Sequence, residues 1–291
     1  MATERKLSRN EAPEHNRPTK AQPPAAGRLS RRDDKSGRWR THLLFLFSIL
    51  FVWELTARLC AVSPLLLPPV SEVIASLGTD LGSGVLVGRI AFSLLIIFQG
   101  VGLGALGALL LSAAVWSGGR SVARSIDSAV AFLHPLPGIA LLPLVILWAG
   151  TGRTAVLLII VHSVIWPLTT NLTGGIRAVP EHLYDVSRNY RLGHLQMMRH
   201  LILPSTLPYL IAGLRIGWAR AWRALIAAEM VFGAAGGSGG LGWYLFQQRV
   251  FMDTRGMFAG ILIIMIIGVL FEELLFESLE RGTVRKWGMS R

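Results

Sequence analysis

The sequence has little charge and very little lysine. Only 16% of its 291 residues are Asp, Glu, Lys or Arg, whereas 52% are hydrophobic and the mean hydropathy is +0.50. Soluble domains rarely have this composition, and polytopic helical membrane proteins commonly do. The composition therefore predicts an all-α fold made of membrane-spanning helices.

The few lysines lie near the ends of the chain, as Lys6, Lys20, Lys35 and Lys286. A phosphate-binding P-loop needs a lysine after its glycine-rich turn, because that side chain reaches the phosphates. The apolar part of the chain therefore cannot hold ATP in this way. We expect this chain to hydrolyse no ATP and to bind no cofactor.

Other catalytic and metal-binding patterns are also missing from the sequence. The single cysteine excludes an intrachain disulfide and a cysteine-based metal site, and the seven histidines lack the spacing of metal ligands. Residues 236–240 match Gly-x-Ser-x-Gly, but no histidine follows them, so we expect no hydrolase nucleophile there. The sequence predicts neither an enzyme nor a metal site.

Positive charge is concentrated at the start of the chain. Residues 1–40 hold eleven Lys or Arg against five Asp or Glu, with few large apolar residues. Such a segment cannot bury enough apolar surface to order itself, which predicts a disordered tail at 1–40 and a membrane domain at 41–288. A net charge of +12 can indicate nucleic-acid binding. Here the charge is spread over tails and short loops, which favours the lipid bilayer as partner and no nucleic acid.

Six stretches are apolar enough to cross a bilayer as helices of about 20 residues. In the first, Glu54 and Arg58 are four residues apart and can pair on one helix face. In the second, Gly100, Gly104 and Ala108 have the same spacing, which permits close helix packing. The six predicted spans cover residues 42–62, 90–116, 128–149, 154–172, 208–232 and 257–279.

Basic residues divide the segments between these spans into two groups. Segments 1–40, 117–127, 173–205 and 280–291 carry most of the Lys and Arg, and the segments on the other side carry four Arg. Cytoplasmic segments of membrane proteins are the basic ones. The pattern therefore predicts that both termini and segment 173–205 lie in the cytoplasm.

Several motifs keep an order and spacing that point to one family. They are Pro64 to Pro69 followed by Glu72 and Val73; Arg89, Ser93, Leu94 and Gly100; the proline-patterned run from His134 to Gly152; and Trp222, Ala228-Glu229-Met230 and Gly240-Leu241-Gly242. From about residue 45 to 288 the chain resembles the nitrate/sulfonate/taurine-type permeases of ATP-binding cassette (ABC) importers, the binding-protein-dependent inner-membrane component.

This resemblance implies the six-helix fold of type I importer permeases, the MetI-like kind, in the cell inner membrane. It also implies three kinds of partner: a second permease copy, two ABC ATPase subunits on the inside and a solute-binding protein on the outside. The substrate it implies is a small anionic or organic solute such as nitrate, a sulfonate or taurine.

The segment before Ile202-Leu203-Pro204 resembles the cytoplasmic "EAA" loop of these permeases, which contacts the ATPase. The family's Glu-Ala-Ala stands nineteen residues before the proline, a place that Asp185, Val186 and Ser187 occupy here. Arg191 replaces the family's glycine, and we expect Gly193 to move the bend by two residues. A helix from about Arg188 to His200 is expected to insert into the ATPase. Its contact residues would be Arg188, Arg191, Leu192, Leu195, Met197, Met198 and Arg199.

Proline in the third span suggests part of the substrate pathway. Pro135, Pro137 and Pro143 remove backbone hydrogen bonds, and broken helices at membrane depth must line a cavity or be covered by protein. We therefore expect these three prolines near the pathway or its gate.

The fifth span carries four charged residues, which need partners or a function. Arg215 and Arg220 lie closer to its start, where snorkelling to lipid headgroups suffices. Arg223 and Glu229 lie deeper. Our preferred interpretation is that they form ion pairs. The alternative is that Arg223 offers a positive site to a passing anion.

Two other functions are compatible with a polytopic chain. A stand-alone secondary transporter would need no ATPase, but segment 185–204, the lack of an inverted repeat and the lack of central acid pairs argue against it. A structural or signalling membrane protein is the other alternative. The sequence leaves open whether the second copy is identical.

Overall fold

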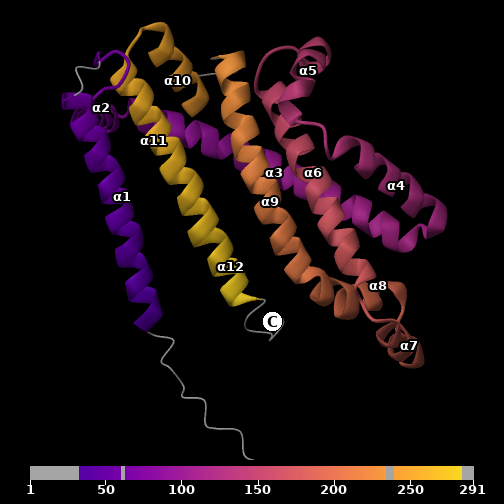
Figure 1. The fold of residues 1–291 in the computed structure, drawn as a ribbon. Coiled ribbons are helices and arrows are strands. Elements are labelled where there is room, and N and C mark those ends of the chain that lie inside the picture. The colour runs from indigo at the N-terminus through magenta and orange to yellow at the C-terminus, as the bar shows by residue number, and fades with distance from the viewer. Residues whose placement is uncertain (1–32, 60–62, 234–238, 284–291) are drawn as a thin grey trace, which may run out of the picture. The chain divides into compact units, whose positions relative to one another are not determined.

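The computed structural model describes residues 33–59, 63–233 and 239–283, and this part of the chain contains helices and turns but no strand (Figure 1). The expected all-α fold is confirmed for it. Helix α1 (Asp33–Leu59) includes residues 33–40 of the predicted tail, while the tail's first 32 residues lie outside the described part. The chain divides into two compact units between Phe51 and Val52, and the packing and sites described below belong to the second.

Four helical stretches in the described residues are long and apolar enough to cross a membrane. The first predicted span falls on α1, whose following residues 60–62 are not described. The four stretches are α3 (Val85–Ser117), α6 (Arg153–Arg177), the run of α8 (His194–Met197), η2 (Met198–Ile202) and α9 (Leu203–Phe232), and the run of α11 (Thr254–Leu270), η3 (Phe271–Phe276) and α12 (Glu277–Gly282).

The third predicted span is a broken pair of helices and not one helix. Helix α4 (Gly119–Leu133) is bent by 89° against the stretch Gly138–Ala149, which consists of η1 (Gly138–Leu141) and α5 (Leu142–Ala149). Pro135 and Pro137 lie at the bend, where Pro137 is extended with ψ of 130°. Proline lacks the N–H that would continue α4, so the helix ends there.

Pro143 does not break a helix, contrary to the prediction. It lies in the first turn of α5, where the N–H groups have no partner within the helix in any case. Pro204 has the same place in α9. This helix therefore begins at Leu203, five residues before the predicted start of the fifth span at 208. The π-helical turn η2 precedes it and joins it to α8 without a gap.

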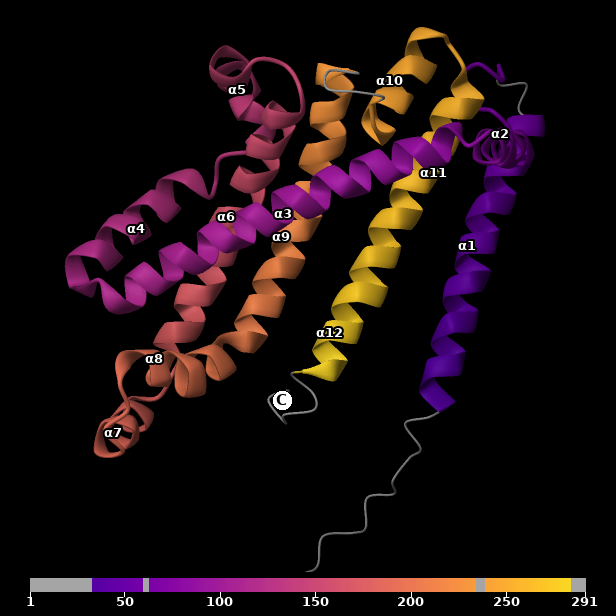
Figure 2. The ribbon, with the colours of Figure 1, turned by 180° about the vertical axis from the view of Figure 1, so that it is seen from behind.

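Helices α3, α6 and α9 form the core of the second unit, with α6 and α9 side by side and α3 running across them (Figure 2). Gly104 shows how closely α3 approaches α6, since a Cβ atom added there would lie 2.8 Å from Cβ of Val164. Gly100 meets Ile160 in the same way, and Ala108 is fully buried. The close packing predicted for Gly100, Gly104 and Ala108 is therefore confirmed.

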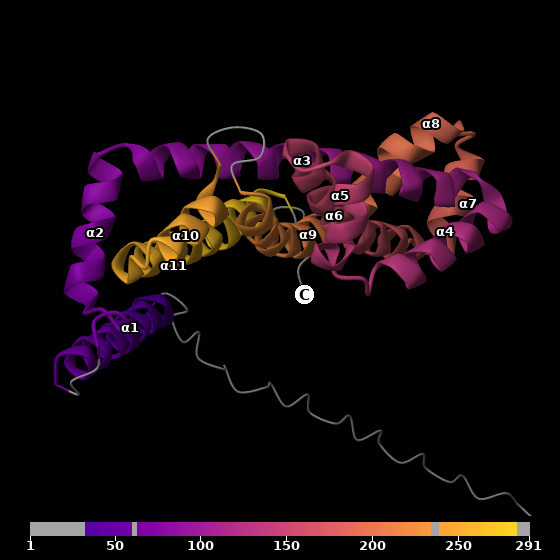
Figure 3. The same cartoon turned by 90° about the horizontal axis from the view of Figure 1, so that it is seen from above.

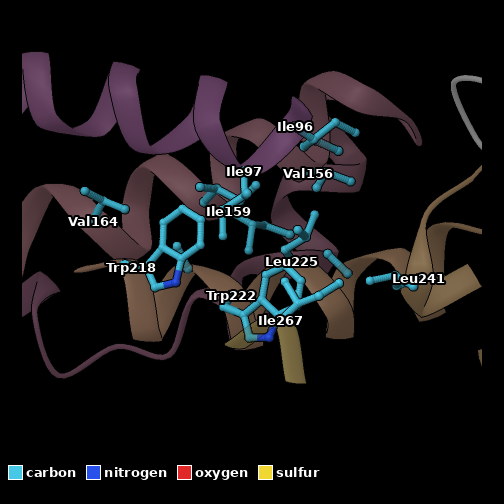
Figure 4. Packing of buried hydrophobic residues seen from close by; sticks show 14 of the residues in the cluster. Ile96, Ile97, Val156, Ile159, Val164, Trp218, Trp222, Leu225, Leu241 and Ile267 are labelled. Carbon is cyan, nitrogen blue, oxygen red and sulfur yellow. The ribbon is translucent and has the colours of Figure 1, made fainter. Parts of the chain in front are cut away.

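The centre of this core is apolar and aromatic (Figure 4). Ile97 of α3, Ile159 of α6 and Leu225 of α9 are completely buried there, and Trp218 stacks near Trp222 with ring centroids 6.5 Å apart. Close packing of such side chains holds helices together in a bilayer, where the lipid itself is apolar.

Helices α2 (Val70–Gly82), α10 (Leu241–Val250) and α11 lie next to the core. Helix α10 packs on α9 and α11, and α2 packs on α11 (Figure 3). The pair predicted from the sequence, Glu54 and Arg58, is confirmed with a 2.6 Å contact. The same carboxylate accepts from the Ser71 hydroxyl at the start of α2, at 2.9 Å.

Candidate functional site

The predicted ATPase-contact segment consists of two short helices joined by a turn. Helix α7 (Glu181–Asn189) ends before a turn at 190–193, and α8 begins at His194. The single helix predicted from Arg188 to His200 is therefore wrong. The predicted residues divide between the two helices, with Asp185, Val186, Ser187 and Arg188 on α7 and Leu195 on α8, while Met198 and Ile202 belong to η2 and Leu203 and Pro204 begin α9.

Arg191 itself makes the bend. Its φ is +52°, in the left-handed region, and its N–H donates to the carbonyl of Arg188 at 2.8 Å. The N–H of Leu192 donates to the carbonyl of Ser187 at 3.1 Å. This pair of bonds is a Schellman motif, whose left-handed position usually carries glycine. The expected shift of the bend to Gly193 is wrong, because Gly193 is extended (φ −68°, ψ 164°) and caps α8.

The bend exposes apolar side chains. Leu195 is 82% exposed and Tyr190 is 77% exposed, and Val186, one turn before Tyr190, is about half exposed. The sequence reasoning did not single out Tyr190, although it lies three residues after Ser187 of the Asp185–Ser187 motif. Arg188 pairs with Asp185 at 3.6 Å within α7, while Arg191 and Arg199 are exposed. The arrangement offers an apolar surface with basic residues around it.

The other face of the segment is attached to the core helices. The His194 ring lies 5.3 Å from the Trp116 ring at the end of α3. Tyr184 lies near the end of α6, and burial raises the pKa of its hydroxyl above the ordinary value. Ser187 and Ile202 are buried. A displacement of α7 or α8 would therefore be transmitted to α3 and α6 through these contacts.

Some of the residues predicted to lie near the substrate pathway are found together at the break between α4 and η1. Pro135, Pro137 and Arg223 line one cavity of about 270 Å³. Pro143 and Glu229 are not among its lining residues. Arg220 also lines it, and its Nη2 donates to the carbonyl of His134 at 3.0 Å. The prediction that Arg220 only snorkels is therefore wrong, since it satisfies a carbonyl at the break.

Glu229 makes hydrogen bonds to Ser93 and Gly242. The preferred interpretation, an ion pair within α9 or between helices, is not borne out for Arg223 or Glu229 among the described residues. The Glu229 carboxylate accepts from the Ser93 hydroxyl of α3 at 2.8 Å and from the N–H of Gly242 at 2.9 Å. The Ser93 hydroxyl in turn accepts from the N–H of Leu241 at 2.9 Å. These bonds join α3, α9 and the start of α10, and we call Ser93, Glu229, Leu241 and Gly242 the Ser93 cluster.

Close approach at the Ser93 cluster requires residues without a Cβ atom. A Cβ on Gly242 would lie 2.7 Å from Cβ of Glu229, and one on Gly240 would overlap the Glu229 carboxylate. Arg89 continues the network, donating to the carbonyl of Gly239 at 3.2 Å. The motifs that were quoted separately from the sequence, around Arg89, Glu229 and Gly240, thus meet at one place. Residues 234–238 of the glycine-rich loop lie outside the described residues.

In the described part of the chain, no group of three or more His, Cys, Asp or Glu residues could hold a metal ion. The chemistry available at both sites is therefore contact and charge: an apolar surface at the bend, and two guanidinium groups at a cavity.

Comparison with known proteins identifies the family. Residues 100–285 match the family described as "Binding-protein-dependent transport system inner membrane component". The putative aliphatic sulfonates transport permease protein SsuC of Bacillus subtilis (strain 168) is 30% identical over 86% of this chain and 88% of that protein. The taurine transport system permease protein TauC of Escherichia coli (strain K12) is 30% identical over 77% of this chain and 82% of that protein.

Solved structures agree at the level of the fold. The inward-facing MetNI methionine ABC transporter has a chain that matches with a TM-score of 0.55 and 18% identity, over 67% of this chain and 95% of that chain. An amino acid ABC transporter crystallised with histidines matches with a TM-score of 0.54 and 18% identity, over 72% of this chain and 97% of that chain. The chain therefore belongs to the binding-protein-dependent inner-membrane permeases of ABC importers.

Proposed function

We propose that this chain is one of two permease subunits that together form the substrate pathway of an ABC importer. Its ATPase subunits would contact the segment 181–204 in the cytoplasm, and an external binding protein would deliver the solute. Support for the side comes from the basic residues of segment 173–205. Support for the solute comes from relatives named for aliphatic sulfonates, taurine and nitrate.

The observation that carries the proposal is the apolar surface at the Arg191 bend. Exposed Leu195 and Tyr190 are costly in water unless a partner covers them, and large apolar side chains near a bend are suited to a groove. The surrounding Arg191 and Arg199 would orient that partner through acidic residues. The contacts of the segment with α3 and α6 give the ATPases a route for moving the core.

The test is to place a charge in this surface. Leu195→Asp should abolish copurification of the ATPase subunit of the same transport system, because a carboxylate would be buried in an apolar groove without a partner. Phe251→Asp, at an equally exposed residue after α10, is the matched control and should keep copurification. ATP-dependent uptake into proteoliposomes is measured in parallel. Wild-type uptake without any ATPase would favour a stand-alone transporter, and normal copurification of Leu195→Asp would refute the contact.

A further inference from the structure

Arg220 and Arg223 bring two positive charges to one cavity, one helical turn apart on α9. The cavity measures about 270 Å³, and its other walls are Pro135 and Pro137 from the break after α4 and Ser163 from α6. Both arginines therefore line a space that is formed where the backbone of the third span is interrupted.

Neither arginine is neutralised by a carboxylate in the described part of the chain. Among the described residues, no carboxylate lies within ion-pair distance of Arg220 or Arg223, whereas Arg215 on the same helix pairs with Glu272 at 3.2 Å. Arg220 gives one N–H to the His134 carbonyl, and Arg223 gives its Nε–H to the carbonyl of Ala219 at 3.0 Å. A guanidinium has five N–H groups, so most of the donors at this cavity remain available.

The position of the pair along α9 makes this arrangement costly. Arg223 lies nine residues before the helix end at Phe232, which places it about 14 Å from that end at 1.5 Å per residue. Arg220 is about 5 Å deeper. Charges inside membrane helices are rarely left unpaired, and like charges one turn apart repel each other. Snorkelling to lipid headgroups does not explain two side chains that line the same cavity.

We propose that this cavity is a subsite for a small oxyanion, such as the sulfonate or nitrate group of a solute in transit. The inference rests on the proposed function and specifies which residues select the charge of the substrate. Guanidinium groups bind planar or tetrahedral oxyanions through paired N–H donors, which fits a site built from two arginines. The phosphate of a lipid headgroup has the same chemistry, so the test must separate these two sources.

The test measures thermal unfolding of the purified permease–ATPase complex in a neutral detergent. Methanesulfonate is the probe, dimethyl sulfone is its uncharged analogue, and sodium chloride at equal ionic strength is the reference. We expect methanesulfonate to raise the Tm of the wild type while dimethyl sulfone leaves it unchanged. Arg223→Gln should weaken the apparent affinity at least tenfold, Arg223→Lys should keep part of it, and Arg215→Gln should match the wild type.

Three outcomes would overturn the inference. They are a wild type that does not respond to methanesulfonate, an Arg223→Gln variant that responds like the wild type, and stabilisation by phosphatidylglycerol that methanesulfonate cannot compete away. Arg220→Gln also removes a bond to the His134 carbonyl. If the Arg220→Gln variant fails to fold, the Arg223→Gln variant alone tests whether the arginines bind the anion. Copurification of the ATPase is scored on the same samples. Its loss in the wild type would contradict the proposed function, whereas the Tm response reports on the cavity alone.

Discussion

At the scale of single residues, Arg191 holds a backbone conformation that is unfavourable for any residue with a Cβ atom. Its φ of +52° completes the Schellman motif at the end of α7. The left-handed conformation costs about 1 kcal/mol for such a residue, and glycine adopts it without steric cost. Arg191→Gly should therefore raise the free energy of unfolding by up to about 1 kcal/mol, measured as a higher Tm of the detergent-solubilised protein.

The control for this substitution is Asn189→Gly, two residues earlier in α7. Asn189 has helical backbone, where glycine costs about 0.5 kcal/mol or more through lost chain entropy. This variant should lower the Tm. If both glycine variants changed the Tm in the same direction, the left-handed strain at Arg191 would not be the cause.

The hydroxyl group of Ser93 in the Ser93 cluster gives a second prediction, which concerns stability. Ser93→Ala removes the hydroxyl bond to the buried Glu229 carboxylate, which keeps only the bond from the Gly242 N–H, and it leaves the buried Leu241 N–H without a bond. Unsatisfied buried polar groups cost about 1 to 3 kcal/mol, so the free energy of unfolding should fall by that amount. Ser112→Ala is the matched control on α3, because its buried hydroxyl has no partner among the described residues. Equal Tm values for the two variants would contradict a stabilising role for the Ser93 cluster.

At the scale of helices, the sequence predicted what depends on composition and local chemistry. Apolar length placed four of the six predicted spans, and Pro135 and Pro137 marked the interruption of the third one, although not its 89° bend. The turn at Arg191 was missed because its signal is a backbone conformation and the usual glycine is absent. The partner of Glu229 was missed because Ser93 is 136 residues away in the chain, and only packing of α3 against α9 brings them together.

The same contrast explains the two arginines of α9. From the sequence, Arg220 was assigned to the lipid headgroups because it lies near the start of its helix. Position along the helix was the only information about its surroundings that could be read from the sequence. The structure adds the direction in which the side chain points, toward the His134 carbonyl and the cavity beside it. Direction depends on neighbouring helices, which one helix's sequence does not specify.

At the scale of the whole molecule, the ATPase contact and the anion subsite are compatible only with one orientation in the membrane. The Arg191 bend must face the cytoplasm, and the turn after α10 must face the opposite side. Charge asymmetry predicts this arrangement, since cytoplasmic segments are the basic ones. The orientation can be measured without reference to substrate or ATPase.

Labelling of single cysteines tests this orientation, because the chain contains only one cysteine, Cys60. In a Cys60→Ser background, Tyr190→Cys and Phe251→Cys each place a thiol at a residue that is more than 70% exposed. A membrane-impermeant maleimide added to intact cells should label the thiol at 251, and should label the thiol at 190 only after permeabilisation. Labelling of position 190 in intact cells would place segment 181–204 outside. No cytoplasmic ATPase could then reach it, and the coupling proposal would fail while the family assignment remained.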